Sequence, residues 1–279
     1  MIKKMETKSG TKTLEINGYK FFLDGYLYNN LNIVKYEAIP NKWDGLIIVH
    51  GKEGTGKTTL AAQAALYLSN DFNIDYVAWK PGQFTQIIDD AKPESSILWD
   101  EAITGARASQ WADNINQTIV QKLTMIRKKK LKILICFPYL WMLDKYFVSR
   151  CLASIYVYSK GFEDRGHAFA YNQEQTEYLY AMMKEKYRLN PSAAFNACYK
   201  SFFFRFDKRF VLPEKEYDKR KTEATKNLEP DKDIWRDHCI NTWRYIREHP
   251  SIIFKDMCRS INLTDQYVYR VMKQTELIV

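Results

Sequence analysis

The stretch that decides the fold is GLIIVHGKEGTGKTTLAAQAALYL, residues 45–68. Within it, LIIV is a continuous apolar run, as expected for a strand that is buried on both faces of a sheet. A glycine-rich turn follows, and TTLAAQAALYL then supplies residues that favour a helix. The stretch therefore predicts a buried strand, a tight loop and a helix, in that order.

The loop GKEGTGKT, residues 51–58, fits the pattern G-x-x-x-x-G-K-[ST] in full. Glycines allow backbone angles that a side chain forbids, so the N–H groups of the loop converge on phosphate oxygens at the positive end of the helix. Lys57 is expected to reach the β- and γ-phosphates of ATP, and Thr58 to hold Mg²⁺. The predicted nucleotide-binding residues are Gly51, Lys52, Glu53, Gly54, Thr55, Gly56, Lys57, Thr58 and Thr59.

Two carboxylates end another apolar run, ILWDEA, residues 97–102. Asp100 is expected to support Mg²⁺, and Glu101 to orient and polarise the attacking water. A solvated Asp–Glu turn at a strand end is the plain structural alternative. The pair follows the phosphate loop by one strand–helix–strand unit, which favours ATP hydrolysis.

Short apolar runs alternate with helical segments along the rest of the core. This alternation predicts an α/β fold with a parallel sheet covered by helices on both faces. The expected strands are 74–79, 96–102, 132–137 and 153–159, the expected helices 81–91, 109–129 and 140–152, and a hairpin or edge strands are expected over 161–180.

GKEGTGKT together with ILWDEA resembles the Walker A and Walker B motifs of the additional-strand, catalytic-glutamate P-loop ATPases, over about residues 45–160. The resemblance implies a sheet in which another strand separates the two motif strands. WDEAITGAR and the helix ending in MIRKKK look most like the RecA/FtsK/HerA side, which includes phage and mobile-element DNA translocases and zonula-occludens-toxin-like proteins. The toxin-like proteins commonly carry a membrane segment, and none is visible here.

ATPases of this kind commonly form rings in which an arginine from a neighbour stabilises charge on the γ-phosphoryl group. Arg107, Arg127 and Arg150 are candidates, with Arg127 and Arg150 preferred, and a surface arginine without a role is the alternative for each. The resemblance thus implies a homo-oligomeric ring, a pentamer or hexamer. Pro138 and Tyr139 follow the strand at 132–137, where such ATPases often have a polar sensor residue.

The overall composition indicates which kind of partner and which cell compartment to expect. The 279 residues carry a net charge of +9 with a pI of about 9.1, which favours a polyanionic partner. No signal peptide is visible, and the longest apolar run, within residues 131–143, is too short to span a bilayer. We therefore expect a cytoplasmic protein without membrane contact. Five widely spaced cysteines argue against a disulfide framework and a zinc site.

The chain is expected to contain four parts. These are a β-rich N-terminal lead-in (1–44), the P-loop ATPase domain (45–217), a polar linker (218–232) and a helix-turn-helix-like domain (233–279). In the last part, Thr264 is a good N-cap for a third helix whose exposed face would meet a DNA groove. Residues 231–279 hold 8 Lys and Arg against 7 Asp and Glu, so a small bundle for protein contacts is the alternative.

Two basic stretches could contact nucleic acid. Six cations without an intervening acid lie at 122–132: Lys122, Arg127, Lys128, Lys129, Lys130 and Lys132. A helix end whose lysines face its negative pole explains them equally well. YKSFFFRFDKRF, residues 199–210, interleaves aromatic and basic residues as in single-strand binders, although an alternating buried strand is the favoured interpretation.

The sequence therefore predicts an ATP-hydrolysing DNA motor or DNA-handling ATPase that uses ATP and Mg²⁺ and acts on double-stranded DNA as a ring. The alternative is an ATP-switched DNA-binding or helicase-loader-like assembly protein without motor activity. A metabolite kinase is disfavoured, because no convincing acceptor-binding lid is visible.

Overall fold

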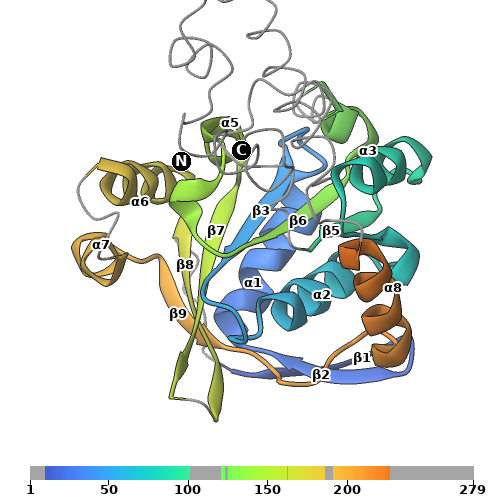
Figure 1. The fold of residues 1–279 in the computed structure, drawn as a ribbon, viewed down its shortest axis with the longest axis horizontal. Coiled ribbons are helices and arrows are strands. Elements are labelled where there is room, and N and C mark those ends of the chain that lie inside the picture. The colour runs from blue at the N-terminus through green and yellow to red at the C-terminus, as the bar shows by residue number, and fades with distance from the viewer. Residues whose placement is uncertain (1–9, 101–120, 123–124, 162, 186–190, 227–279) are drawn as a thin grey trace, which may run out of the picture. The chain divides into compact units, whose positions relative to one another are not determined.

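The computed structural model describes residues 10–100, 121–122, 125–161, 163–185 and 191–226. The chain divides into two compact units, Met1–Lys219 and Arg220–Val279. The sheet and the phosphate loop both lie in the first unit, so the fold described below is that of the first unit (Figure 1).

A seven-stranded sheet forms the centre of this unit, in the order β4-β5-β6-β3-β7-β8-β9. Its strands are β3 (Gly45–His50), β4 (Val77–Ala78), β5 (Ser96–Trp99), β6 (Lys132–Phe137), β7 (Ala153–Lys160), β8 (Asp164–Asn172) and β9 (Phe202–Arg205). The strands from β4 to β7 are parallel, and β8 and β9 extend the sheet in antiparallel fashion. The predicted α/β architecture with a parallel sheet is confirmed.

The sheet order places β6 between β3, which leads into the phosphate loop, and β5, which leads to Asp100. This is the separation of motif strands that the family resemblance implied. Leu46 pairs with Ile133 on one side of β6, and Ile97 pairs with Ile133 on the other. Because parallel strands all point the same way, the phosphate loop and Asp100 meet at one edge of the sheet.

Helices cover both faces of the sheet (Figure 1). The described helices are α1 (Gly25–Ile33), α2 (Lys57–Leu68), α3 (Pro81–Asp90), α5 (Lys145–Arg150), α6 (Gln173–Glu185), α7 (Pro191–Ala197) and α8 (Glu214–Lys226), with short π and 3₁₀ segments at Val34–Ala38, Ile74–Tyr76 and Leu140–Met142. Helix α2 packs against β5 and β6, while α3 packs against β4 and β5. A two-stranded sheet of β1 (Lys12–Ile16) and β2 (Tyr19–Leu23) precedes α1.

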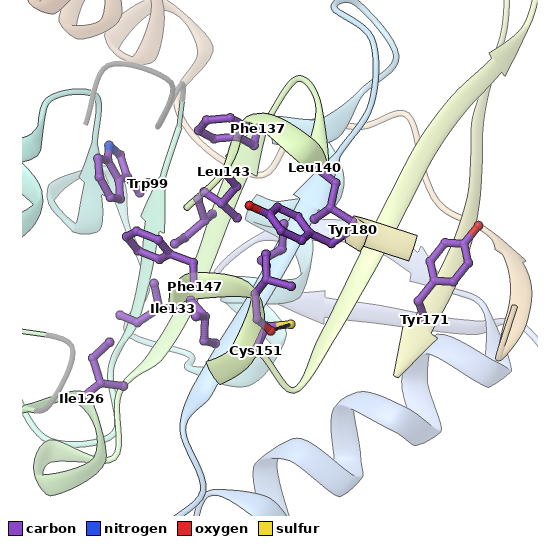
Figure 2. Close-up of a cluster of buried hydrophobic side chains, with 14 of the residues drawn as sticks. Trp99, Ile126, Ile133, Phe137, Leu140, Leu143, Phe147, Cys151, Tyr171 and Tyr180 are labelled. Atoms are coloured by element: carbon purple, nitrogen blue, oxygen red, sulfur yellow. Dashed lines mark hydrogen bonds between the residues drawn. The ribbon is translucent and has the colours of Figure 1, made fainter. Parts of the chain in front are cut away.

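A hydrophobic core cluster lies between the sheet and the helices α3, α5, α6 and α7. Figure 2 shows part of it, with Trp99 and Ile133 on neighbouring strands and Phe147 of α5 lying against them. The Trp99 ring is fully buried and stacks on Phe84 of α3, with ring centroids 4.3 Å apart. Ile126, from the helix expected over 109–129, is buried in the same core, although most of that helix lies outside the described residues.

Several segments differ from the expected secondary structure. The strand expected over 74–79 begins with a 3₁₀ turn, Ile74–Tyr76, and only Val77–Ala78 form a strand. In the β-rich lead-in, the hairpin forms, but residues 25–38 are helical, because the Asp24 carboxylate accepts from the Tyr26 N–H and caps α1. The helix expected over 140–152 is divided, since Asp144 caps a new helix, α5, by accepting from the Tyr146 N–H. Of the hairpin expected over 161–180, only β8 is a strand, and α6 begins at Gln173.

The C-terminal part of the chain is described only as far as residue 226. The described part of the expected linker, 218–226, continues helix α8, whose sequence is rich in Glu, Lys and Ala. The helix-turn-helix-like domain expected at 233–279 lies outside the described residues. Within the part that the structure describes, no helix combines the length and the hydrophobicity that crossing a bilayer requires.

Candidate nucleotide-binding and hydrolysis site

The phosphate loop joins β3 to α2 and has the backbone that its glycines predict. Gly51, Gly54 and Gly56 all have positive φ, at 149°, 74° and 99°. A Cβ atom on Gly51 would lie 2.1 Å from the Val157 carbonyl oxygen, so no other residue fits there. The neighbouring strand β7 thus fixes where the loop begins.

Hydrogen bonds within the loop hold its shape. The Lys52 carbonyl accepts from the Thr55 hydroxyl at 2.8 Å and from the Lys57 ammonium at 3.0 Å. Lys52, Glu53 and Gly54 are exposed, while Thr55 is buried. The Gly51 N–H donates to the carbonyls of Phe137 and Pro138, so the end of β6 also supports the loop.

Thr58 and Asp100 meet although 42 residues separate them in the sequence. The Thr58 hydroxyl, in the first turn of α2, donates to Asp100 Oδ1 at 2.9 Å. Asp100 follows β5 directly and is only 2% exposed, and its N–H donates to the Ala78 carbonyl at 2.9 Å. The two residues predicted to serve Mg²⁺ therefore lie together at the carboxyl edge of the sheet.

These oxygens fit Mg²⁺ that arrives with a nucleotide. Mg²⁺ prefers oxygen ligands and usually takes one or two from protein, with the rest from phosphates and water. A hydroxyl and a carboxylate side by side supply such a pair. No cluster of three or more His, Cys, Asp or Glu residues forms a cation site of its own among the described residues.

The second carboxylate oxygen of Asp100 accepts a hydrogen bond from the Tyr217 hydroxyl. Tyr217 lies in the first turn of α8, 117 residues further along the chain, and is 6% exposed. Burial, and then the charge of Asp100, raise the pKa of Tyr217 above its ordinary value, which keeps the phenol protonated as the donor. Tyr217 could not be predicted from the sequence, because nothing in the local pattern of α8 marks it.

His50 occupies the last position of β3, directly before the phosphate loop. It is fully buried, its ring lies 5.5 Å from the Tyr156 ring, and its Nε2 atom finds no hydrogen-bond partner among the described residues. Burial, and then the nearby charge of Lys57, lower the pKa of His50 to about 3. The imidazole is therefore neutral at physiological pH.

The two preferred arginine candidates lie at the opposite edge of the sheet. Asp44, directly before β3, accepts from Arg127 Nη2 at 3.1 Å and from Arg150 Nη2 at 2.8 Å. The six residues of β3 separate Asp44 from the loop, about 20 Å at roughly 3.3 Å per residue. Both arginines are therefore held far from the phosphate loop of the same chain.

Of the remaining predicted site residues, one lies within the described part of the chain and two lie outside it. Thr59 is half-buried in the first turn of α2. Glu101, the predicted catalytic carboxylate, and Arg107 lie outside the described residues. Their roles stay predictions.

The basic cluster at 122–132 is mostly engaged within the subunit. Lys129 donates to the carbonyls of Ile88, Asp89 and Ala91, the last carbonyls of α3, and so caps that helix. The other contacts are Lys122 with Asp89, Arg127 with Asp44, Lys130 with Glu94, and Lys132 with the Glu94 carbonyl. Five of the six cations thus have partners, which favours the structural interpretation of this cluster.

Residues 41–141 match the family described as Novel STAND NTPase 3. This range contains the phosphate loop, β5 and the contact between Thr58 and Asp100. The chain is a P-loop ATPase. This confirms the predicted enzyme class, and nucleotide binding with it.

No curated protein sequence matches this ATPase. Among solved structures, the N-terminal domain of zonular occludens toxin from Neisseria meningitidis is 15% identical, with a TM-score of 0.42, covering 60% of this chain and 96% of that one. The genome packaging NTPase B204 of Sulfolobus turreted icosahedral virus 2, in complex with AMPPCP, is 10% identical, with a TM-score of 0.36, covering 48% and 94%. At these values, neither likeness bears on the activity of the ATPase.

Proposed function

We propose that the chain is an ATP-driven DNA-handling enzyme that works as a homo-oligomeric ring and translocates, packages or transfers DNA. The observation that carries the ATP-driven part is the 2.9 Å contact between Thr58 and Asp100 beside the phosphate loop. In this proposal Lys57 contacts the β- and γ-phosphates, Thr58 and Asp100 hold Mg²⁺, and Glu101 orients the attacking water. When bound, Mg²⁺ neutralises charge on the transferred phosphoryl group.

DNA contact is proposed for a cationic groove beside β9, and no longer for the cluster at 122–132. The groove has a volume of about 520 Å³ and is lined by Thr11, Phe22, Asp24, Arg165, Arg205, Phe206, Asp207 and Lys208. Its two acids have other partners, since Asp24 caps α1 and Asp207 pairs with Arg209. Two of its three cations are engaged as well: Arg205 pairs with Asp164 at 3.2 Å, and Lys208 donates to the Glu163 carbonyl at 3.2 Å. The proposed DNA contact therefore rests mainly on the exposed Arg165. Phe203 of the edge strand β9 is 45% exposed, so an aromatic ring stands near the cations, a combination typical of nucleic-acid surfaces.

The first experiment measures ATP turnover with and without double- and single-stranded DNA. We expect DNA to stimulate turnover several-fold, and both Lys57→Ala and Glu101→Gln to abolish it by removing phosphate contact and water activation. Turnover that ignores every form of DNA contradicts the DNA-handling role but leaves the ATPase assignment intact.

A second experiment tests the groove with a matched pair of charge-neutralising variants. Arg165→Gln should weaken DNA binding by about 1 kcal/mol, roughly fivefold, and reduce the salt dependence of binding by one contact. Lys122→Gln removes the same charge from a side chain that already pairs with Asp89 at 2.5 Å, and should change DNA binding little. Equal losses in the two variants would assign the DNA affinity to net charge alone.

The alternative, an ATP-switched assembly protein, keeps one observation in its favour. Five of the six cations in the cluster at 122–132 contact the protein itself, so the charge facing outward is smaller than the sequence indicates. Triplex displacement separates the two functions, since only a motor strips a third strand along the duplex. Deleting residues 233–279 should lower DNA affinity and spare nucleotide binding if that segment contacts DNA.

A further inference from the structure

The segment 206–217, here called the strap, connects β9 at one edge of the sheet with the residue that contacts Asp100. In Figure 1 it is the orange trace that leaves β9 and leads to the start of α8. Phe206 begins the strap against the phosphate loop, where a Cβ on Gly56 would lie 3.3 Å from its ring. Tyr217 ends the strap at Asp100.

Helix α2 holds the middle of the strap. The Gln63 side-chain amide is fully buried and donates to the Asp207 carbonyl at 2.9 Å and the Arg209 carbonyl at 2.7 Å. The Asp207 carboxylate also accepts from the Phe22 N–H at 3.1 Å. Because α2 also carries Thr58, the strap and the proposed Mg²⁺ site share one rigid support.

Aromatic neighbours fix the ring of Tyr217. Its ring meets Trp79 edge-on, with centroids 5.5 Å apart, and Phe210 edge-on at 5.0 Å. The Tyr217 N–H donates to the Pro213 carbonyl at 2.9 Å, which closes the first turn of α8. The hydroxyl therefore has a defined direction, toward Asp100.

Asp100 is nearly inaccessible, and each of its two carboxylate oxygens receives a hydroxyl donor, Thr58 on Oδ1 and Tyr217 on Oδ2. Two donors from different elements fix the plane of a carboxylate, which a single donor leaves free to rotate. That plane decides which way the carboxylate faces a metal ion held by Thr58.

We propose that Tyr217 is a positioning residue of the ATP site, whose hydroxyl orients the Asp100 carboxylate for Mg²⁺. The inference rests on the proposed role of Asp100 in holding Mg²⁺. It also gives α8 a direct connection to that site, because a shift of the first turn of α8 removes one of the donors to Asp100.

The test measures how Mg²⁺ changes the affinity for ADP, by calorimetry with and without the metal. Tyr217→Phe removes the hydroxyl and keeps the ring between Trp79 and Phe210. We expect it to weaken Mg²⁺-dependent ADP binding about three- to tenfold, the effect of losing one ordinary hydrogen bond, and to leave ADP binding in EDTA unchanged. Tyr178→Phe, a hydroxyl deletion at a side chain that is 53% exposed, should change neither.

Asp100→Asn distinguishes the proposed role of Asp100 in holding Mg²⁺ from the proposed role of Tyr217 in orienting Asp100. If it reduces the Mg²⁺ effect without abolishing it, and Tyr217→Phe added to it causes no further loss, Tyr217 acts through Asp100. If Asp100→Asn weakens the Mg²⁺ effect but Tyr217→Phe alone does not, even with a lowered melting temperature, the positioning role is overturned. If Asp100→Asn itself leaves the Mg²⁺ effect intact, the proposed role of Asp100 fails first.

A second variant at the same position retains a donor. Tyr217→4-aminophenylalanine places an amino group where the hydroxyl stands, and should keep the Mg²⁺ effect within about twofold of the unmodified protein. This variant keeps the test decisive even if Tyr217→Phe does not fold. Loss of the Mg²⁺ effect in a folded protein that retains the donor would overturn the proposal.

Discussion

At the scale of single residues, two glycines of the phosphate loop that are alike in the sequence pattern differ in the room that the fold leaves for a side chain. Gly51 and Gly54 both have positive φ, but only Gly51 is closed in, with the Val157 carbonyl where a Cβ would stand. An added Cβ on Gly54 meets nothing within 4 Å. The motif predicts both glycines, whereas only the structure shows that the fold itself depends on one of them.

Gly51→Ala and Gly54→Ala therefore make a matched pair. Gly54→Ala should lower the free energy of unfolding by about 1 kcal/mol, the cost of a left-handed alanine. Gly51→Ala must also push β7 away from β3, and we expect a loss of about 3 kcal/mol or more. Urea unfolding of the two variants checks this, and equal losses would show that the contact with Val157 has no weight.

His50 predicts a pH dependence of stability. Its pKa is about 3 in the folded chain against 6.5 in a free side chain, so the unfolded chain binds more protons between these values. The free energy of unfolding should fall as the pH falls through this window, by about 1.6 kcal/mol between pH 6.5 and 5 from this group alone. Well above pH 6.5 the imidazole is neutral in both the folded and the unfolded chain, so this group no longer lowers the free energy of unfolding.

His50→Phe supplies the comparison, because it keeps an aromatic ring beside Tyr156 and removes the titrating group. Urea unfolding at several pH values should show a shallower decline for the variant than for the unmodified protein between pH 6.5 and 5. Identical slopes would mean that the pKa of His50 is the same in the folded and unfolded chains, contrary to the effect expected of burial.

At the scale of elements, periodic runs could be predicted from the sequence and contacts between distant elements could not. The strand–loop–helix at 45–68 follows from local residue types, and so does the position of Asp100 at a strand end. Where a helix boundary differed from the one expected, a capping side chain set it. Asp144, for example, divides the helix expected over 140–152. Tyr217 escaped prediction because its partner Asp100 lies 117 residues away.

Ion pairs between distant residues could not be predicted from the sequence either. Arg127 and Arg150 both pair with Asp44, here called the Asp44 cluster, although all three lie far apart in the chain. The Arg150 side chain is 18% exposed and that of Asp44 10%, so water screens this pair weakly. Asp44→Asn should cost about 1–3 kcal/mol of stability, because it leaves the Arg150 charge without its acid. Glu94→Gln, which breaks the exposed pair with Lys130, should cost less than about 0.5 kcal/mol.

Unfolding experiments at low and high salt distinguish these two pairs. The loss in Asp44→Asn should persist at high salt, while any loss in Glu94→Gln should disappear as mobile ions screen the surface. If both losses vanish together, the Asp44 pair is as well solvated as a surface pair, and its arginines are available for another role.

At the scale of the whole molecule, the arrangement of charges bears on assembly. Arg127 and Arg150 lie at the amino edge of the sheet, and Lys57 and Asp100 at the carboxyl edge. One subunit cannot bring the two sets together, because β3 holds them apart. A head-to-tail ring could, since it places the amino edge of one subunit near the carboxyl edge of the next.

The mass of Glu101→Gln with and without ATP tests this assembly, because a variant that binds ATP but hydrolyses it slowly holds the ATP-bound state. We expect a closed oligomer of five or six subunits with ATP and smaller species without it. One mass under both conditions would contradict ATP-dependent assembly.

Mixed assemblies then test whether an arginine acts in trans. A Lys57→Ala subunit keeps its arginines but lacks a working site, and an Arg127→Gln subunit keeps its site but lacks one candidate arginine. Each variant alone should hydrolyse ATP poorly, whereas a mixture should regain turnover, because intact sites then meet intact arginines across the interface. Arg127 suits this experiment better than Arg150, since its side chain is 55% exposed and its loss disturbs the Asp44 cluster less. A mixture no more active than its components would exclude Arg127 as the trans residue, and the same design with Arg150→Gln would then decide the remaining candidate.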